Sequence, residues 1–339
     1  CLPNPNLTCT VEWEGRWRAR SRRTRKGIGI MPENYIGVDV AKDWVDVFDP
    51  DTGIGQRIDT EKLAEFARAN TNRLVVAEAS GGYERPLIAA LEAAGTRYVR
   101  VNPRHAREFA RATGKLAKTD RTDARTLAAM GEALKLEPDA PACRARTRLA
   151  ALNARRDALK AHMKKEKTRL QQTSDTWIRA DIKSLLAILE RRVLKVEAEI
   201  ASAIKANDDL TRLDRRLRSA PGVGKIVSAV LIGKLPELGQ ANRRQIASLA
   251  GLAPHAHDSG YMRGKRRIWG GRKEVKSALY IAAFIASRKD PEMMAERARM
   301  QATGKPFKVV IIALARRLLT RLNSIVKEDR NYRFEPLAG

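Results

Sequence analysis

The sequence predicts an α/β domain, followed by a long helical coiled-coil segment and a mostly α carboxyl-terminal domain. Between residues 34 and 136, short runs rich in Ile and Val alternate with helix-forming segments, which is typical of a sheet with helices on its faces. Residues 145–206 are almost all helix formers, and residues 207–330 contain shorter apolar helices separated by loops. Residues 1–33 fit none of these patterns, so we expect them to form a basic, disordered extension.

Alternation of strands and helices defines the first domain. Its strands are predicted at residues 35–40, 44–48, 55–59, 73–77 and 98–101, and its helices at residues 61–69 and 84–94, with a last helix that starts near residue 120. Residues 49–53 contain Asp, Pro and Gly and form the turn after the second strand. Pro and acidic residues at 137–141 interrupt the helical periodicity and predict a linker.

Two amphipathic helices are predicted between residues 145 and 206. Apolar residues recur there at spacings of three and four, with polar residues between them. The helices are expected to pair either antiparallel within one chain or between subunits, and we expect a homo-oligomer, either a dimer or a tetramer. Further helices are predicted after residue 225, at residues 246–252, 275–287 and 308–326, with a loop at residues 253–273.

The charge balance points to a polyanionic partner. The chain has 66 Lys and Arg against 39 Asp and Glu, a formal net charge of +27, which favours nucleic acid. A membrane partner would require an amphipathic anchor or a span of about 18 apolar residues, and the sequence has neither. The three cysteines form no C-x-x-C pair and predict no disulfide framework. Residues 1–30 lack the apolar core of an export signal, so we expect a cytoplasmic protein.

Four acidic residues occupy positions that a folded sheet would bring together. Asp39 closes the first strand and Glu78 closes the buried fourth strand, and the carboxyl ends of neighbouring parallel strands line one crevice. Asp120 and Asp123 share a face of the following helix. Without cations four such carboxylates would repel one another, and their hard oxygen ligands suit Mg²⁺ or Mn²⁺. Each acid alone is more often a turn, cap or surface residue, but their order along the chain matches the ribonuclease-H-like nuclease plan.

Three acidic blocks resemble those of the insertion-sequence-110 family of transposases, whose catalytic domain is similar to Holliday-junction resolvases. The blocks are Ile36-Gly37-Val38-Asp39-Val40-Ala41-Lys42, Glu78-Ala79-Ser80-Gly81-Gly82-Tyr83 and Lys118-Thr119-Asp120-Arg121-Thr122-Asp123-Ala124-Arg125. The resemblance covers roughly residues 35–330. It implies a DNA transposase or site-specific recombinase that excises and inserts a mobile element, with a structured guide RNA as a further partner.

The second half contains a segment that resembles the family's carboxyl-terminal signature. It consists of residues 250–254 (Ala-Gly-Leu-Ala-Pro), Asp258-Ser259-Gly260 and Arg263-Gly264. The resemblance implies that Ser259 attacks a DNA phosphate and that the acidic site activates it. Tyr261 and Met262 stand where relatives often have small or polar residues. Without the resemblance, residues 258–260 read as an ordinary turn.

A basic loop and a glycine-rich turn are the candidate nucleic-acid contacts. Six of the eleven residues from 263 to 273 are basic, and Trp269 lies among them, where an indole can stack on an exposed base. The turn at residues 221–225 is similar to a helix-hairpin-helix turn, whose backbone N–H groups bind phosphate. The predicted contacts are Gly222, Gly224, Lys225, Arg263, Lys265, Arg266, Arg267, Trp269, Arg272 and Lys273.

Three other functions remain compatible with parts of the sequence. A junction-resolving nuclease would use the acidic site and water alone. An architectural protein would bridge DNA through its long helices and basic loop, with purely structural acids. A kinase of the actin-like fold can begin with a strand such as residues 36–39, but no second phosphate-binding glycine loop follows here.

Overall fold

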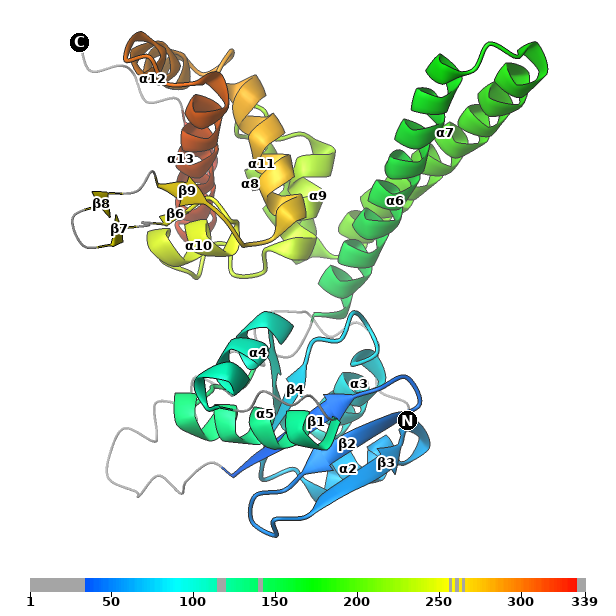
Figure 1. The fold of residues 1–339 in the computed structure, drawn as a ribbon. Coiled ribbons are helices and arrows are strands. Elements are labelled where there is room, and N and C mark those ends of the chain that lie inside the picture. Colours follow the sequence, from blue (N-terminus) through cyan, green and yellow to red (C-terminus); the bar gives the residue numbers. More distant parts are fainter. Residues whose placement is uncertain are drawn as a thin grey trace. The chain divides into compact units, whose positions relative to one another are not determined.

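A computed structural model describes residues 34–114, 120–139, 143–255, 258–259, 262–263 and 266–333. For residues 120–122, 255, 258–259 and 262–263 it describes the backbone alone. The basic extension at residues 1–33 and Lys265 lie outside these ranges, as do the side chains of Asp120, Ser259 and Arg263. The chain forms two compact bodies that divide between residues 141 and 142 (Figure 1).

The amino-terminal body contains a five-stranded mixed sheet. Its strand order is β3-β2-β1-β4-β5, in which β2 is antiparallel to both neighbours and β1, β4 and β5 are parallel. The strands are β1 (Tyr35–Val40), β2 (Trp44–Phe48), β3 (Gly55–Asp59), β4 (Leu74–Glu78) and β5 (Arg97–Val101). This mixed sheet with its helices is compatible with the ribonuclease-H-like plan expected from the sequence.

Helices cover both faces of this sheet (Figure 1). Side chains alternate between the faces of a strand, so Ile36, Val38 and Val40 pack with one set of helices. Tyr35 faces the opposite side and packs with the other set. The first set is α2 (Leu63–Ala69), preceded by the short helix η1 (Thr60–Lys62), and α3 (Arg85–Ala94); the second is α4 (Pro103–Ala112) and α5 (Asp120–Leu134).

Helix α5 packs directly on the backbone of β1 because Gly37 has no side chain. A Cβ atom at Gly37 would overlap the carbonyl oxygen of Ala124 and would lie 2.6 Å from the backbone nitrogen of Ala128. We therefore expect Gly37→Ala to destabilise this body by about 1–3 kcal/mol, the usual cost of overpacking. Urea unfolding should show this loss. Gly55→Ala is the matched control, since its nearest neighbour would be 3.8 Å away, and an equal loss in both variants would contradict the packing argument.

Two long helices form an antiparallel hairpin at the start of the second body. They are α6 (Arg144–Gln172) and α7 (Thr176–Lys205), and Asp175 caps α7 by accepting a hydrogen bond from the Ile178 N–H. Their facing apolar side chains bury a narrow core. Arg156 on α6 pairs with Glu197 on α7 at 2.7 Å, which fixes the antiparallel register. The sequence left open whether the two helices pair within one chain or between subunits. In the structure they pair within one chain.

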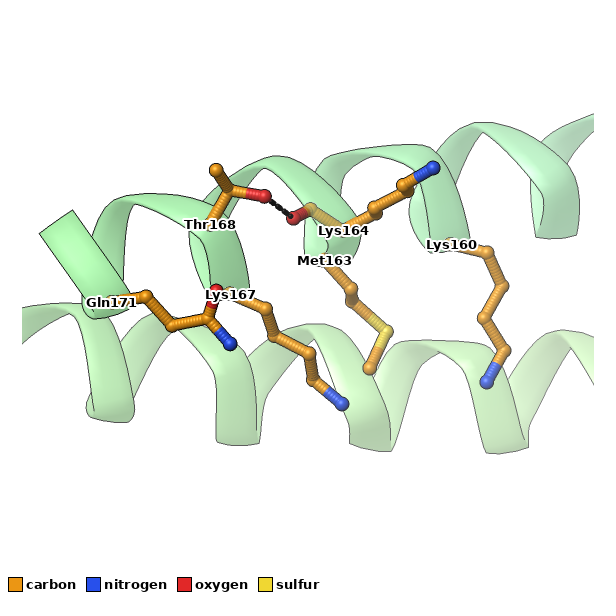
Figure 2. Close-up of a pocket in the computed structure, with 6 residues that line it drawn as sticks. All are labelled: Lys160, Met163, Lys164, Lys167, Thr168 and Gln171. Carbon is orange, nitrogen blue, oxygen red and sulfur yellow. Dashed lines mark hydrogen bonds between the residues drawn. The ribbon is translucent and has the colours of Figure 1, made fainter.

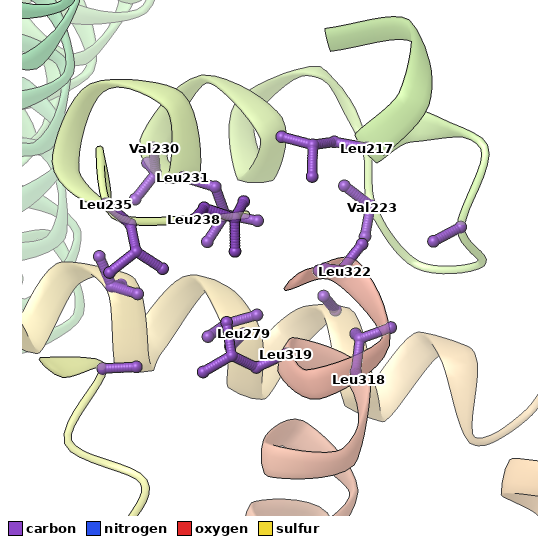
Figure 3. Close-up of a cluster of buried hydrophobic side chains, with 14 of the residues drawn as sticks. Leu217, Val223, Val230, Leu231, Leu235, Leu238, Leu279, Leu318, Leu319 and Leu322 are labelled. Carbon is purple, nitrogen blue, oxygen red and sulfur yellow. The ribbon is translucent and has the colours of Figure 1, made fainter. Parts of the chain in front are cut away.

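The rest of the second body is a helical bundle around a large leucine-rich core (Figure 3). Its helices are α8 (Asp208–Arg218), α9 (Lys225–Lys234), α10 (Arg243–Leu249), α11 (Lys273–Ala286), α12 (Pro291–Ala302) and α13 (Phe307–Lys327). Helix α13 lies at the centre and contacts α8, α10, α11 and α12. In the described part of the chain, no helix combines the length and apolar character needed to span a bilayer.

Several features differ from the sequence expectations. Helices α4, α8 and α12 were not predicted, and the expected loop at residues 253–273 contains four two-residue strands. Cys143, directly before α6, is disulfide-bonded, although the cysteine spacing predicted no disulfide framework. Cys1 and Cys9 lie outside the described residues.

Candidate acidic site and serine-bearing loop

Asp39 and Glu78 occupy equivalent positions on neighbouring parallel strands. Val38 on β1 pairs with Ala77 on β4, so the residue that follows each of them lies at the carboxyl end of its strand. Strands in a sheet are about 4.8 Å apart, and residues at the same register point to the same face. Both side chains are half-buried. The sheet therefore brings together two acids that are 39 positions apart in the sequence.

The first turn of α5 lies above these two strand ends. Gly131 of α5 packs against Tyr35, and Ala124 packs against Gly37, so the helix runs antiparallel to β1. From Gly37 to Asp39 the strand advances about 6.6 Å, and one turn of helix advances about 5.4 Å. The start of α5, where Asp120 and Asp123 lie, therefore comes over Asp39. Asp123 is half-buried.

The donor chemistry of this site fits a hard divalent cation. Its predicted ligands are all carboxylates, and the hydroxyl oxygen of Ser80, two residues beyond Glu78, is buried without a hydrogen-bond partner. Such an orphaned oxygen is suited to an ion or an ordered water. Among the side chains that the structure describes, no three His, Cys, Asp or Glu residues form a metal-binding group. The side chain of Asp120 is outside that set, so the described carboxylates alone do not complete the site.

A further acid, which the sequence reasoning missed, lies beside Asp39. Asp46 on β2 is directly opposite Asp39 in the β1–β2 register and is 5% exposed. Arg57 on β3 donates hydrogen bonds to both of its carboxylate oxygens, at 3.0 and 2.9 Å. The Arg57 guanidinium also stacks over the Trp44 ring, 4.4 Å from its centre. Because Arg57 occupies both oxygens of Asp46, we assign this acid a structural role.

Ser259 lies in a pair of short antiparallel strands within the expected loop. Strand β7 (Asp258–Ser259) pairs with β8 (Met262–Arg263), and Ser259 is opposite Met262. Outside this pair, β6 (Pro254–His255) pairs with β9 (Arg267–Ile268). Two residues separate the paired Ser259 and Met262, so the serine backbone lies next to the connection between the two strands.

Close backbone packing and an ion pair hold the two ends of this serine-bearing loop together. A Cβ atom at Gly271 would overlap the backbone of Gly251, so the two chain segments touch without side chains between them. Arg272 donates a backbone hydrogen bond to the Leu249 carbonyl at 2.9 Å. Its guanidinium donates two hydrogen bonds to Glu237, at 2.5 and 2.6 Å. Arg272, a predicted nucleic-acid contact, is thus engaged in holding the base of the loop.

The Glu237–Arg272 pair predicts a pH-dependent contribution to stability. Burial alone would raise the pKa of Glu237, but hydrogen bonds from Arg272 and backbone outweigh it and hold the pKa below the usual 4.5. A lowered folded-state pKa stabilises the fold above the unfolded pKa, and this contribution is lost as the pH falls through the folded value. Glu237→Gln should lower the free energy of unfolding by about 1–2 kcal/mol at pH 7. This value allows for solvent screening, because the side chains of both partners are one-third exposed. Urea unfolding should show this difference shrink below pH 4.5; a difference that grows in acid would contradict the assignment.

The remaining predicted nucleic-acid contacts are distributed over two places in the second body. Arg266, Arg267 and Lys273 are exposed near the base of the serine-bearing loop, and Trp269 is 49% exposed. At the turn before α9, Gly222 packs against Ala282 of α11 with a positive φ of 79°. Gly224 and Lys225 are exposed, and no side chain caps α9. The N–H groups at this helix start therefore lack a side-chain acceptor.

Comparisons with known proteins find two family matches along the chain. Residues 36–176 match a transposase model of the IS110 DEDD type, and residues 214–298 match the model of the transposase IS116/IS110/IS902 family. Together these matches cover about two thirds of the chain.

Individual relatives extend the similarity to nearly the full length. A pilin gene-inverting protein of Moraxella lacunata is 28% identical over 319 residues, which cover 89% of this chain and 98% of that protein. The pilin gene-inverting protein of Moraxella bovis is 27% identical over 317 residues, with the same coverage. The insertion element IS110 uncharacterized 43.6 kDa protein of Streptomyces coelicolor is 30% identical over 158 residues, covering 46% of this chain and 38% of that protein.

Proposed function

Because this chain belongs to the IS110 family of transposases, we propose that it moves or inverts a DNA segment by attack of Ser259 on DNA phosphates, assisted by the acidic site. The observation that carries the proposal is the convergence of Asp39, Glu78 and the start of α5 at one end of one face of the sheet. The relatives named for gene inversion support strand exchange between two DNA sites rather than cutting alone.

The acidic site supplies the electrostatic part of the proposed reaction. Asp39, Glu78, Asp120 and Asp123 would hold Mg²⁺ or Mn²⁺, which stabilises charge on the oxygens of a phosphoryl group under attack. The carboxylates orient and neutralise the ion. Asp46 lies opposite Asp39 in the strand register, and Arg57 donates hydrogen bonds to both of its carboxylate oxygens. Asp46 therefore does not compete for the ion.

Serine attack conserves the energy of the broken phosphodiester. In the proposed step the Ser259 Oγ atom forms a bond to phosphorus while one P–O ester bond of the strand breaks. The serine loses its proton, and the leaving strand oxygen gains one. Attack by the hydroxyl of a second strand reverses the step, reseals the DNA and returns the serine without nucleotide hydrolysis.

The exposed cations near the serine-bearing loop would hold DNA for this reaction. Arg266, Arg267 and Lys273 can neutralise phosphates, and half-exposed Trp269 can stack on an unpaired base. The uncapped start of α9 at Lys225 suits a phosphate oxygen. A structured guide RNA is a proposed partner because the family resemblance implies it.

Strand exchange with purified components tests the proposal. The reaction contains the protein, DNA with the element ends, a target DNA and the element's non-coding RNA, with Mg²⁺ present or chelated. Recombinant joints that require both the protein and the metal are expected. Cleavage without joints or a covalent protein–DNA adduct would instead indicate a junction-resolving nuclease, and metal-independent DNA compaction without cleavage would indicate an architectural protein.

A further inference from the structure

The outer half of α6 carries cationic side chains without acidic partners. Lys160, Lys164, Lys165 and Lys167, here called the α6 lysine row, are all exposed. Within the described part of the chain none of these four side chains makes a salt bridge, whereas Arg169 beside them pairs with Glu166 at 2.6 Å.

Nearer the start of the same helix, two arginines are paired with acids. Arg148 pairs with Glu199 at 3.1 Å, and Arg156 pairs with Glu197 at 2.7 Å. Both acids lie on α7. The four lysines of the α6 lysine row thus follow one another in the outer half of the helix, beyond both of these pairs.

Two hollows lie on this surface. The first, with a volume of 270 Å³, is lined by Lys160, Met163, Lys164, Lys167, Thr168 and Gln171 (Figure 2). The second, of 320 Å³, is lined by Lys164, Lys165, Thr168 and Arg169. Met163 belongs to the buried hairpin core and is 5% exposed. Lysine side chains therefore line both hollows, with Met163 as the one buried apolar side chain in the lining of the first, and the ammonium groups lie along the helix surface where a chain of anions could follow them.

The spacing of the lysines suits a polyanion. Lys160, Lys164 and Lys167 follow one another at intervals of four and three, so they lie on one face and span about 10.5 Å. Like charges at these intervals repel and weaken an isolated helix. Duplex DNA presents one negative charge per about 1.7 Å of its axis, so several phosphates face such a row and relieve that repulsion.

We infer that the α6 lysine row binds the sugar-phosphate backbone of duplex DNA without reading its sequence. The inference rests on the proposed function only for the choice of DNA as the polyanion. It adds a second DNA contact, on the hairpin, to those expected around the serine-bearing loop.

Salt dependence of DNA binding tests this inference. The triple variant Lys160→Gln, Lys164→Gln, Lys167→Gln is compared with wild type by fluorescence anisotropy on a duplex of about 30 base pairs. Loss of three phosphate contacts should make the plot of log affinity against log salt shallower by about 2.7. The loss should be equal on element-end and unrelated sequences.

A matched control separates contact from net charge. Lys183→Gln, Arg191→Gln, Lys195→Gln removes the same charge from exposed positions of α7, and its slope should change by less than half as much. Neither variant should lower the thermal unfolding temperature, since Gln, Lys and Arg have similar helix propensities and removal of like charges relieves repulsion. Equal slopes for the two triple variants, or no change in the lysine-row variant, would overturn the inference.

Two further comparisons complete the test. An RNA hairpin of similar size replaces the duplex, and loss of RNA affinity with unchanged DNA affinity would refute DNA as the occupant. Ser259→Ala should bind DNA with the wild-type slope. If the lysine-row variant has the wild-type salt slope while the wild-type protein carries out strand exchange, only the inference about the α6 lysine row is overturned. If the lysine-row variant has the shallower slope but the wild-type protein carries out no strand exchange, only the proposed function is overturned.

Discussion

Ser259→Ala should abolish the covalent protein–DNA adduct and lower strand exchange by at least about 10⁴-fold, the scale expected when a nucleophile is removed. No other hydroxyl replaces it in the proposed step, because the Oγ–P bond holds the broken strand. The adduct is measured as a protein-linked DNA band on a denaturing gel after trapping with a suicide substrate. DNA binding should persist, since the exposed cations around the loop are unchanged.

Ser248→Ala provides the control for this experiment. Ser248 lies in α10 of the same body and is exposed, so its removal should leave the adduct intact. A normal amount of adduct in Ser259→Ala would show that another group attacks the phosphate. Wild-type cleavage that never yields an adduct would favour the nuclease that uses water.

Asp39→Asn should reduce strand exchange by about 10³-fold. The proposed metal ion stabilises charge in the reaction by several kcal/mol, and this variant removes one of the carboxylates that would bind it. Asn has nearly the same shape, so the fold should be preserved, and its amide lacks the negative charge that binds the ion. The rate of joint formation is measured at several Mn²⁺ concentrations. Excess Mn²⁺ should restore part of the activity if the defect is weakened ion binding.

Asp46→Asn removes the same charge one strand away and serves as the matched control. Asp46 lies opposite Asp39 but gives both carboxylate oxygens to Arg57, and Asn can still accept one of these hydrogen bonds. We expect this variant to keep most of the activity. A loss as large as that of Asp39→Asn would show that Asp46 belongs to the reacting site.

The strands of the sheet could be predicted from the sequence because the pattern that marks each strand is local. Runs of Ile and Val bounded by turn residues predicted β1, β2 and β3 with the bounds that the structure has. Helix α4 was not predicted because half of its residues are polar or charged and only Ala106 is buried. The short strands around Ser259 have two residues each, too few to produce an alternating pattern.

Pairing between distant residues could not be predicted from the sequence. The Asp46–Arg57 pair depends on the register of β2 and β3, and Glu237–Arg272 joins residues 35 positions apart. No local pattern identifies either pair. The shared face of Asp39 and Glu78 was predicted because parallel neighbouring strands place their carboxyl ends together. The roles of the four acids and of Ser259 remain predictions, which the variants above test.

Crystals of the protein grown with Mn²⁺ and measured near the manganese absorption edge would locate the ion directly. The expected result is an anomalous peak at the carboxyl ends of β1 and β4, within coordination distance of Asp39 and Glu78 and beneath the first turn of α5. Absence of a peak there at saturating Mn²⁺, with these carboxylates pointing to different faces of the sheet, would contradict the proposed acidic site.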